Sequence, residues 1–416
     1  MHVVIFEPCP SGHRFTYVKR VVEALRGLPV RLTLATGPGV RETPSFRQQL
    51  APISDAFEVV DSFPQADPKH KFSYGWNTAR AVARAARELE ADHLIVPAGD
   101  GVTEMLGAAR SLGFASLGNT ELEALLLTVS WVYLEPGSMK RALRRHAWIR
   151  TNIASGARRL HTIDPMLLLA EPLPEPLRSR VVLAPDPVDA LTDVSLVEAR
   201  RRLGVPEDGR LVSAVGRLDE RKGVDLLVRA FASARLGPSD RLLLVGQHAP
   251  EVLSLLRTEA ASLVESGRIL SIDGYVTDEQ MNLAIAAADL VGVTYRRHVG
   301  SASFLIRSAA QGRPVLTSDR GWLGVTCGRF GLGTSCNVRD PDALRHSLEH
   351  ALEHAHEHRP HPASARFVEF HSIENAARFW SQRLRERLQL RDAQEPRTWE
   401  WVLETALPLT GREQVR

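Results

Sequence analysis

Short apolar runs alternate with longer amphipathic stretches along the first half of the chain. Runs of β-branched and aliphatic residues that stop at Gly, Pro or Asp are typical of strands buried in a parallel sheet. The expected strands are Val3–Phe6, Val30–Ala35, Phe57–Val60, His93–Val96, Thr128–Leu134, Leu160–Ile163 and Val181–Leu183. The stretches between them repeat apolar residues at helical spacing, as at Phe15, Val18 and Val22, which predicts amphipathic helices. The alternation predicts an α/β fold with a parallel sheet.

The same alternation starts again beyond the proline- and aspartate-rich segment Pro185–Asp189. The strands expected there are Val212–Val215, Arg241–Val245, Ile269–Ile272, Leu290–Thr294 and Pro314–Thr317. Two consecutive blocks of this kind predict two doubly wound, Rossmann-like domains that face each other across a cleft. We place an N-terminal domain at residues 1–187 and a C-terminal domain at residues 188–366. An amphipathic helix at residues 367–390 and a tail at residues 391–416 follow them.

The composition excludes several classes of protein. A net charge of +3 over 416 residues is too small for nucleic acid to be the main partner. Cys9, Cys327 and Cys336 are too few and too scattered for a disulfide framework or a zinc cluster, and they favour a reducing compartment. No apolar run reaches the length of a membrane span, and the N-terminus lacks a signal-peptide core. We therefore expect a cytoplasmic enzyme.

The first strand of the second block ends in a candidate phosphate-binding turn. Gly216 ends the strand, and the cations Arg217 and Lys222 stand five positions apart before an amphipathic helix. Free amides at a helix N-terminus favour an anion, and two cationic side chains add to that preference. The alternative is an ordinary strand–helix turn with solvated charges.

Three residues of the first half occupy positions where ligands bind in doubly wound sheets, namely the ends of strands. Gly12 and His13 follow the first strand, where we expect Gly12 to let a ligand approach the backbone and His13 to point into the cleft. Asp100 follows the strand His93–Val96, in the position of a catalytic or sugar-binding side chain. The alternatives are a local hydrogen bond for His13 and a helix cap for Asp100.

Two helices suggest other interactions. The helix Met139–Arg150 carries five cations, and its expected inner face is Met139, Ala142, Leu143 and Ala147. Such a helix can rest on an anionic membrane surface or be a solvated surface helix. In a later helix, histidines recur every four residues, at His346, His350, His354 and His358. This spacing suits a metal ion, but the glutamates among these histidines favour a solvated face, so we expect no metal site.

Most of the chain resembles the retaining GT-B glycosyltransferases of family 4, also called glycosyl transferases group 1, and the resemblance is strong only from about Val181 to Asp340. Five motifs stand in the order and at the spacing of that family: Pro185–Asp189, Val215–Leu218 followed by Lys222–Gly223, Leu243–Gly246, Gly274–Val276 and Ala310–Val315. The resemblance implies a GT-B fold, with an acceptor-side N-terminal domain and a donor-binding C-terminal domain. The helix at residues 367–390 would then cross back to the N-terminal domain.

The resemblance also implies an activity, which is transfer of a sugar from a nucleotide-diphosphate sugar, with retention and without metal or cofactor. The acceptor, whether a glycan, a lipid or a small molecule, is left open. Arg217 and Lys222 would stabilise the leaving diphosphate. The residues implied to bind the donor are Gly216, Gly246, Tyr275, Val276, Gly300, Ser301 and Arg307. Gly12, His13, Asp100 and His298 would line the cleft on the acceptor side.

The chain departs from this family at two positions. The family carries two glutamates eight positions apart before the turn Ala310–Val315, where this chain has Val299 and Arg307. In the family these glutamates contact the transferred sugar and the ribose, so both roles are unassigned here. Arg307 would instead add a third cation beside Arg217 and Lys222, unless it is a surface arginine. The departure motivates an alternative, a catalytically weak or inactive GT-B protein that binds a phosphorylated ligand or a protein partner.

Overall fold

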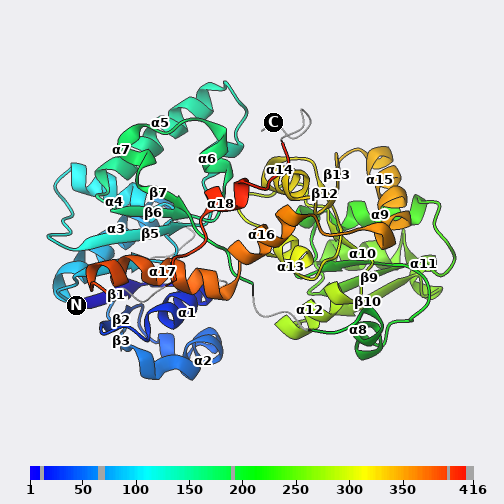
Figure 1. The fold of residues 1–416 in the computed structure, drawn as a ribbon, viewed down its shortest axis with the longest axis horizontal. Coiled ribbons are helices and arrows are strands. Elements are labelled where there is room, and N and C mark those ends of the chain that lie inside the picture. The colour runs from blue at the N-terminus through cyan, green and yellow to red at the C-terminus, as the bar shows by residue number, and fades with distance from the viewer. Residues whose placement is uncertain (10–13, 64–70, 189–192, 391–393, 409–416) are drawn as a thin grey trace. The chain divides into compact units, whose positions relative to one another are not determined.

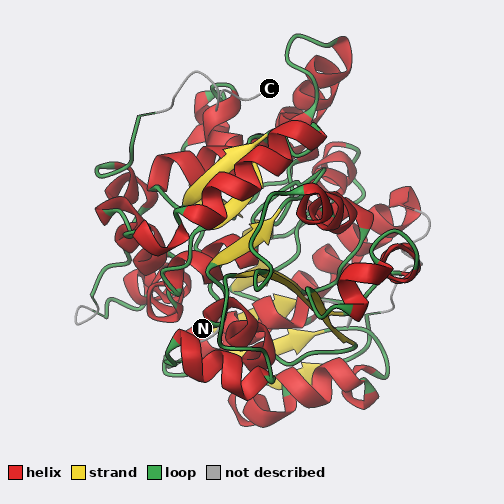
Figure 2. Cartoon of the chain, turned by 90° about the vertical axis from the view of Figure 1, so that its right-hand side faces the viewer, coloured by secondary structure: helices red, strands yellow, loops and turns green. Residues whose placement is uncertain are grey.

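The computed structural model describes residues 1–9, 14–63, 71–188, 193–390 and 394–408. The chain divides into two compact units (Figure 1). The first unit comprises Met1–Asp186 and Glu374–Arg397, and the second comprises Pro187–Ile373 and the described residues from Thr398 onward. In each unit the strands lie between layers of helices (Figure 2).

The first unit contains a seven-stranded parallel sheet in the order β3-β2-β1-β4-β5-β6-β7. Its strands are β1 (His2–Phe6), β2 (Arg31–Ala35), β3 (Glu58–Val60), β4 (His93–Val96), β5 (Glu121–Leu126), β6 (Arg159–Thr162) and β7 (Val181–Leu183). The helices of this unit are α1 (Arg14–Leu25), α2 (Pro44–Gln49), α3 (Lys71–Glu88), α4 (Val102–Ser111), α5 (Met139–Ala154), α6 (Met166–Ala170) and α7 (Glu175–Arg178). Short 3₁₀ helices lie at η1 (Val40–Glu42), η2 (Ala51–Ala56) and η3 (Ser130–Tyr133). Apolar residues of β1 and α1 form the core as the helical spacing predicted.

The strand predicted at Thr128–Leu134 is wrong. Residues of that range form η3, and the strand between β4 and β6 is β5, Glu121–Leu126. Glu123 explains the error, because this charged residue lies inside the strand, buried, with its carboxylate 2.8 Å from His161 Nε2. A glutamate inside an apolar run interrupts the hydrophobic pattern that marks a buried strand. The strand is therefore missed when the residue that pairs with the glutamate lies far away in the sequence.

The expected inner face of the basic helix is also wrong. In α5 the buried side chains are Arg141, Trp148 and Asn152, whereas Met139 and Leu143 are 78% and 64% exposed. Arg141 is held inside because its guanidinium donates to the carbonyl oxygens of Val132 and Leu134 at 3.2 and 2.9 Å. Met139 and Leu143 of α5 therefore face outward, although Trp148 of the same helix is buried.

The second unit contains a six-stranded sheet in the order β10-β9-β8-β11-β12-β13, in which all the pairings are parallel. Its strands are β8 (Leu211–Val215), β9 (Arg241–Gly246), β10 (Ile269–Asp273), β11 (Leu290–Val293), β12 (Val315–Ser318) and β13 (Gly333–Cys336). The first helices of this unit are α8 (Leu196–Leu203), η4 (Glu220–Lys222), α9 (Val224–Ser233), α10 (Pro250–Arg257), α11 (Ala261–Glu265) and α12 (Asp278–Ala286). The later ones are α13 (Ser303–Ala310), α14 (Gly321–Phe330), α15 (Pro341–Glu353), η5 (Ala355–Glu357), α16 (Pro362–Phe370) and α18 (Trp399–Leu403).

Helix α17 (Ile373–Arg387) brings the chain back to the first unit, where Trp380 and Leu384 join the core of β1 and α1. Arg383 anchors it through two bonds to Glu121, at 2.8 and 3.2 Å, and a contact of 3.3 Å with Glu123. The chain then returns to the second unit, so the range taken as a single tail, 391–416, is divided between the units at Arg397.

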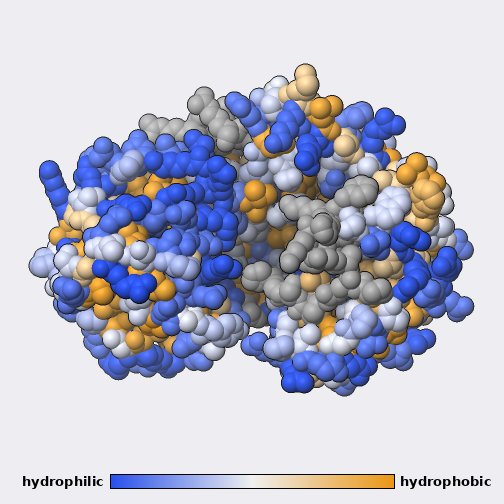
Figure 3. All heavy atoms as spheres, turned by 180° about the vertical axis from the view of Figure 1, so that it is seen from behind, coloured by the Kyte–Doolittle hydropathy of each residue, from blue (hydrophilic) through white to orange (hydrophobic). Residues whose placement is uncertain are grey.

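Among the described residues, no helix is both long and apolar enough to cross a membrane. On the face shown in Figure 3, hydrophilic residues cover most of the surface, and apolar residues form small separate groups.

Candidate functional site

The turn after β8 requires glycine. Gly216 has φ +100°, in the region that L side chains avoid, and a Cβ there would come 2.7 Å from Lys222 Nζ and 2.8 Å from the Phe304 ring. Gly246, at the end of β9, has φ +122°, and a Cβ on it would come 2.1 Å from the carbonyl oxygen of Gly216. The two glycines let the ends of neighbouring strands press together. The close approach of the two strand ends therefore leaves no room for a side chain at either glycine.

Lys222 is buried beside this turn. Its ammonium lies 4.6 Å from the Phe304 ring centre and 5.5 Å from that of Tyr295, and it donates to the carbonyl oxygen of Val215 at 3.4 Å. Burial, together with the nearby charge of Arg221, lowers the pKa of Lys222 to about 8, while Asp219 acts in the opposite direction. Among the described contacts, no carboxylate forms an ion pair with this ammonium. An incoming anion would therefore supply a counter-charge that the fold leaves out.

Arg217 differs from Lys222 because 72% of its side chain is exposed. Its Nε lies 3.9 Å from Asp219, a distance beyond a hydrogen bond, so little holds the guanidinium in one orientation. Asp219 itself accepts the backbone N–H of Lys222 at 3.0 Å and so fixes η4. The turn combines one positioned cation with one adaptable cation.

The segment before α13 adds a second group of polar atoms to this unit. His298 Nε2 lies 2.8 Å from the carbonyl oxygen of Ser301, and its ring packs edge-on against Tyr295. Burial lowers the pKa of His298 to about 4, so the imidazole is neutral at pH 7. The hydroxyl of Ser301 is buried and has no hydrogen-bond partner among the described residues. Gly300, with φ +88°, shapes the segment that presents this hydroxyl.

Arg307 is not the surface arginine that one interpretation expected. Only 7% of it is exposed, and its guanidinium donates to Asn282 at 2.6 Å and to Asp278 at 3.0 Å, both on α12. Its charge is thus already offset within the fold, and its role in donor binding stays a prediction. Val299, at the other departure from the family, is 37% exposed.

The segment after β10 carries the residues expected beside a nucleotide base. Gly274 has φ +134°, Tyr275 is 83% exposed and Val276 is half-buried. His248, which the sequence did not single out, lies close to this segment, with Nδ1 3.0 Å from Asp273 and 2.6 Å from the carbonyl oxygen of Gly246. It thereby ties the end of β9 to the end of β10. Nothing in the sequence around His248 distinguishes it, because its partners are supplied by the sheet.

In the first unit, Asp100 does not cap a helix. Helix α4 begins after Gly101 with no side-chain cap, and the Asp100 carboxylate accepts the backbone N–H groups of Leu127 and Thr128 at 3.0 and 2.7 Å. Burial raises the pKa of Asp100. Glu7, which no pattern in the sequence singles out, is buried after β1 and pairs with Arg14 at 3.1 Å. Gly12 and His13 lie outside the described residues.

The histidine series does not continue on one helix, because α15 ends at Glu353, before His354 and His358. Within the part of the chain that the structure describes, no group of three His, Cys, Asp or Glu side chains is placed to hold a metal ion.

Residues 197–366 match the family described as glycosyl transferases group 1. This segment, which is less than half of the chain, is similar to the group 1 glycosyltransferases. A curated relative, the D-inositol 3-phosphate glycosyltransferase of Salinispora tropica, is 32% identical over 162 residues, which cover 36% of this chain and 33% of the relative. The chain thus matches about a third of the length of this relative.

Solved structures extend the likeness to both units. The sucrose-phosphate synthase of Thermosynechococcus elongatus superimposes with a TM-score of 0.67 at 18% identity, over 94% of this chain and 100% of that one. HepE of Anabaena in complex with UDP gives a TM-score of 0.63 at 14% identity, over 94% and 100%. The fold is therefore GT-B. The matched segment contains Gly216, Arg217, Lys222 and Ser301, whereas Asp100 lies outside it.

Proposed function

We propose that the protein is a retaining glycosyltransferase of family 4 that uses a nucleotide-diphosphate sugar as donor. The observation that carries this proposal is the buried ammonium of Lys222, which faces a glycine turn without a carboxylate partner among the described contacts. The complexes of HepE, a fold relative, contain UDP and UDP-glucose. A diphosphate at the turn would face Lys222 directly and could be reached by the exposed Arg217.

Lys222 and Arg217 would contribute to the reaction by electrostatic stabilisation. When the bond between the sugar and the diphosphate breaks, negative charge develops on the departing oxygen, and cations already in place stabilise that charge. Lys222 is positioned for this by packing, and Arg217 would close on the diphosphate after it binds. Retention in this family needs no enzyme nucleophile, so the proposal requires neither a carboxylate at Val299 nor a metal ion. The acceptor remains a glycan, a lipid or a small molecule.

Release of the nucleotide from a panel of UDP-, GDP- and ADP-sugars tests the proposal. We expect Lys222→Ala and Arg217→Ala each to lower the rate by a factor of about 10²–10³, as for the loss of one transition-state donor. Arg201→Ala is the matched control, because Arg201 is an exposed arginine of α8 in the same unit. Equal release by Lys222→Ala and wild type would exclude the proposed role of this turn.

The second candidate is a binding protein without turnover. It is favoured by Arg307, which stands where the family has a glutamate and is bound to α12. On this alternative, a nucleoside diphosphate raises the melting temperature of the wild type and not of Lys222→Ala, but no nucleotide sugar is cleaved.

We also propose a cytoplasmic protein that touches the inner membrane face through α5. The outward residues Met139 and Leu143 stand among Lys140, Arg144 and Arg150, and the helix contains no acidic residue. Exposed apolar side chains among cations suit an interface with anionic lipid.

A further inference from the structure

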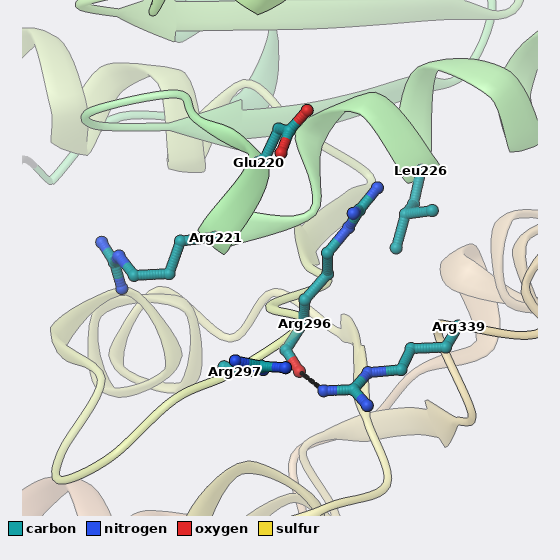
Figure 4. A pocket seen from close by; sticks show the side chains of 6 residues that line it. All are labelled: Glu220, Arg221, Leu226, Arg296, Arg297 and Arg339. Atoms are coloured by element: carbon teal, nitrogen blue, oxygen red, sulfur yellow. Dashed lines mark hydrogen bonds between the residues drawn. The ribbon is translucent and has the colours of Figure 1, made fainter.

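A pocket of about 460 Å³ lies in the second unit, outside the group of residues predicted to bind the donor. Its lining is unusually rich in arginine (Figure 4). The lining residues are Glu220, Arg221, Leu226, Arg296, Arg297 and Arg339. They come from η4, from α9, from the segment after β11 and from the segment after β13. Residues far apart in the sequence thus bring four arginines to the lining of one cavity.

The pocket shares η4 with the candidate phosphate turn, but it uses different side chains. Lys222 directs its ammonium toward Gly216 and the Phe304 ring, while Glu220 and Arg221 of the same 3₁₀ turn line the pocket. Neither Gly216 nor Lys222 is among the lining residues. The backbone N–H of Arg296 donates to the carbonyl oxygen of Arg221 at 3.0 Å, which joins two walls of the pocket.

The charge of the pocket is only partly offset by the fold. Arg296 pairs with Asp225, yet its Nε is buried without a hydrogen-bond partner among the described residues. Arg339 donates to an uncharged group, the carbonyl oxygen of Arg296, at 2.9 Å (Figure 4). For Arg297, the described contacts include no ion pair. Cations that converge without equivalent carboxylates raise the local potential and attract anions.

The geometry of the guanidinium groups indicates which kind of anion the pocket can bind. Guanidinium groups form paired hydrogen bonds with the oxygens of phosphate, and several of them around one cavity can hold more than one negative charge. Pockets of about 300–1,000 Å³ accommodate small molecules. We propose that this pocket binds a phosphate-bearing small molecule at a site separate from the predicted donor site. The inference does not depend on glycosyl transfer.

Calorimetry on the full chain tests the proposal, with inorganic pyrophosphate and glucose 6-phosphate as probes of free and esterified phosphate. The measurements start from Lys222→Ala, because this change removes the other cationic position where a phosphate would bind. We expect this variant to bind at least one of the probes. Adding Arg297→Ala and Arg339→Ala should weaken that binding by about tenfold or more. Both arginines are exposed, so the fold is expected to persist, and circular dichroism checks this.

Adding Arg201→Ala in place of the two pocket changes is the matched control, and it should leave the affinity unchanged. Two results would overturn the proposal. One is that Lys222→Ala binds neither probe, which would assign phosphate binding to the turn alone. The other is that the variant lacking Arg297 and Arg339 binds both probes as tightly as its parent. Nucleotide release from the donor sugar is a separate measurement, so either idea can fail without the other.

Discussion

The ammonium of Lys222 is held in a buried position beside the rings of Tyr295 and Phe304, and we expect binding of an anion there to depend on pH. Because its pKa is about 8, Lys222 loses its charge within a pH range that binding measurements can reach. As the pH rises through that value the free protein loses the charge, so we expect the affinity for a nucleoside diphosphate to fall between pH 7 and pH 9.5. The decrease should approach about tenfold, and titration calorimetry across this range measures it.

Lys222→Arg provides the control for this prediction, because arginine keeps its charge at all these pH values. Binding by Lys222→Arg should vary little with pH, even if it is weaker overall. A fall of the same size in both proteins would place the titrating group elsewhere.

At the scale of single residues, the sequence predicted the backbone conformation of the glycines better than the burial and contacts of the charged side chains. The glycines at 216 and 246 could be predicted because a strand that stops at glycine is a local pattern, and both adopt positive φ. The burial of Lys222 could not, since its walls are Tyr295 and Phe304, more than 70 positions away. The same holds for Arg307, whose partners on α12 determine whether it is free to meet a ligand.

At the scale of elements, hydrophobicity located most strands and helices but misjudged faces where arginine or glutamate is buried. In α5 the rule that apolar residues face inward selected Met139 and Leu143, yet Arg141 takes the inner position because two carbonyl oxygens and Glu171 satisfy its guanidinium. Glu123 misled the assignment of β5 for the same reason. Such positions depend on tertiary partners, and no periodicity encodes them.

The corrected orientation of α5 makes the proposed membrane contact testable. We expect the protein to sediment with vesicles rich in phosphatidylglycerol at low salt and not with vesicles of phosphatidylcholine, because the helix supplies cations. Leu143→Glu should reduce the bound fraction, with an affinity loss of about tenfold from the lost apolar burial and the added negative charge. Val264→Glu is the control, a like change at a partly exposed position of α11. Equal sedimentation of both variants would exclude α5 as the contact.

At the scale of the whole molecule, the chain passes between the two units more than once. The proline- and aspartate-rich segment marked the first passage, and the structure places it at Asp186 and Pro187. The later passages, after Ile373 and after Arg397, leave little trace in the sequence because the helices on either side are all amphipathic. The first unit is therefore completed by Glu374–Arg397, which follows the main part of the second unit in the chain. The second unit is completed in turn by the residues from Thr398 onward.

This arrangement predicts a selective effect of shortening the chain. Ending it after Arg397 removes α18, whose Trp399 packs on Phe330 and Phe370 with ring centres 5.6 and 5.3 Å apart. Loss of a buried tryptophan costs about 3–5 kcal/mol, so we expect faster hydrogen exchange in α14 and α16 of the second unit. Exchange in β4, β5 and β6 should not change, because α17 and its contact between Arg383 and Glu121 remain. A chain that ends after residue 408 keeps α18 and serves as the control. Mass spectrometry of the exchanged peptides measures both units at once, and equal acceleration in both would contradict the separate completion of the two units.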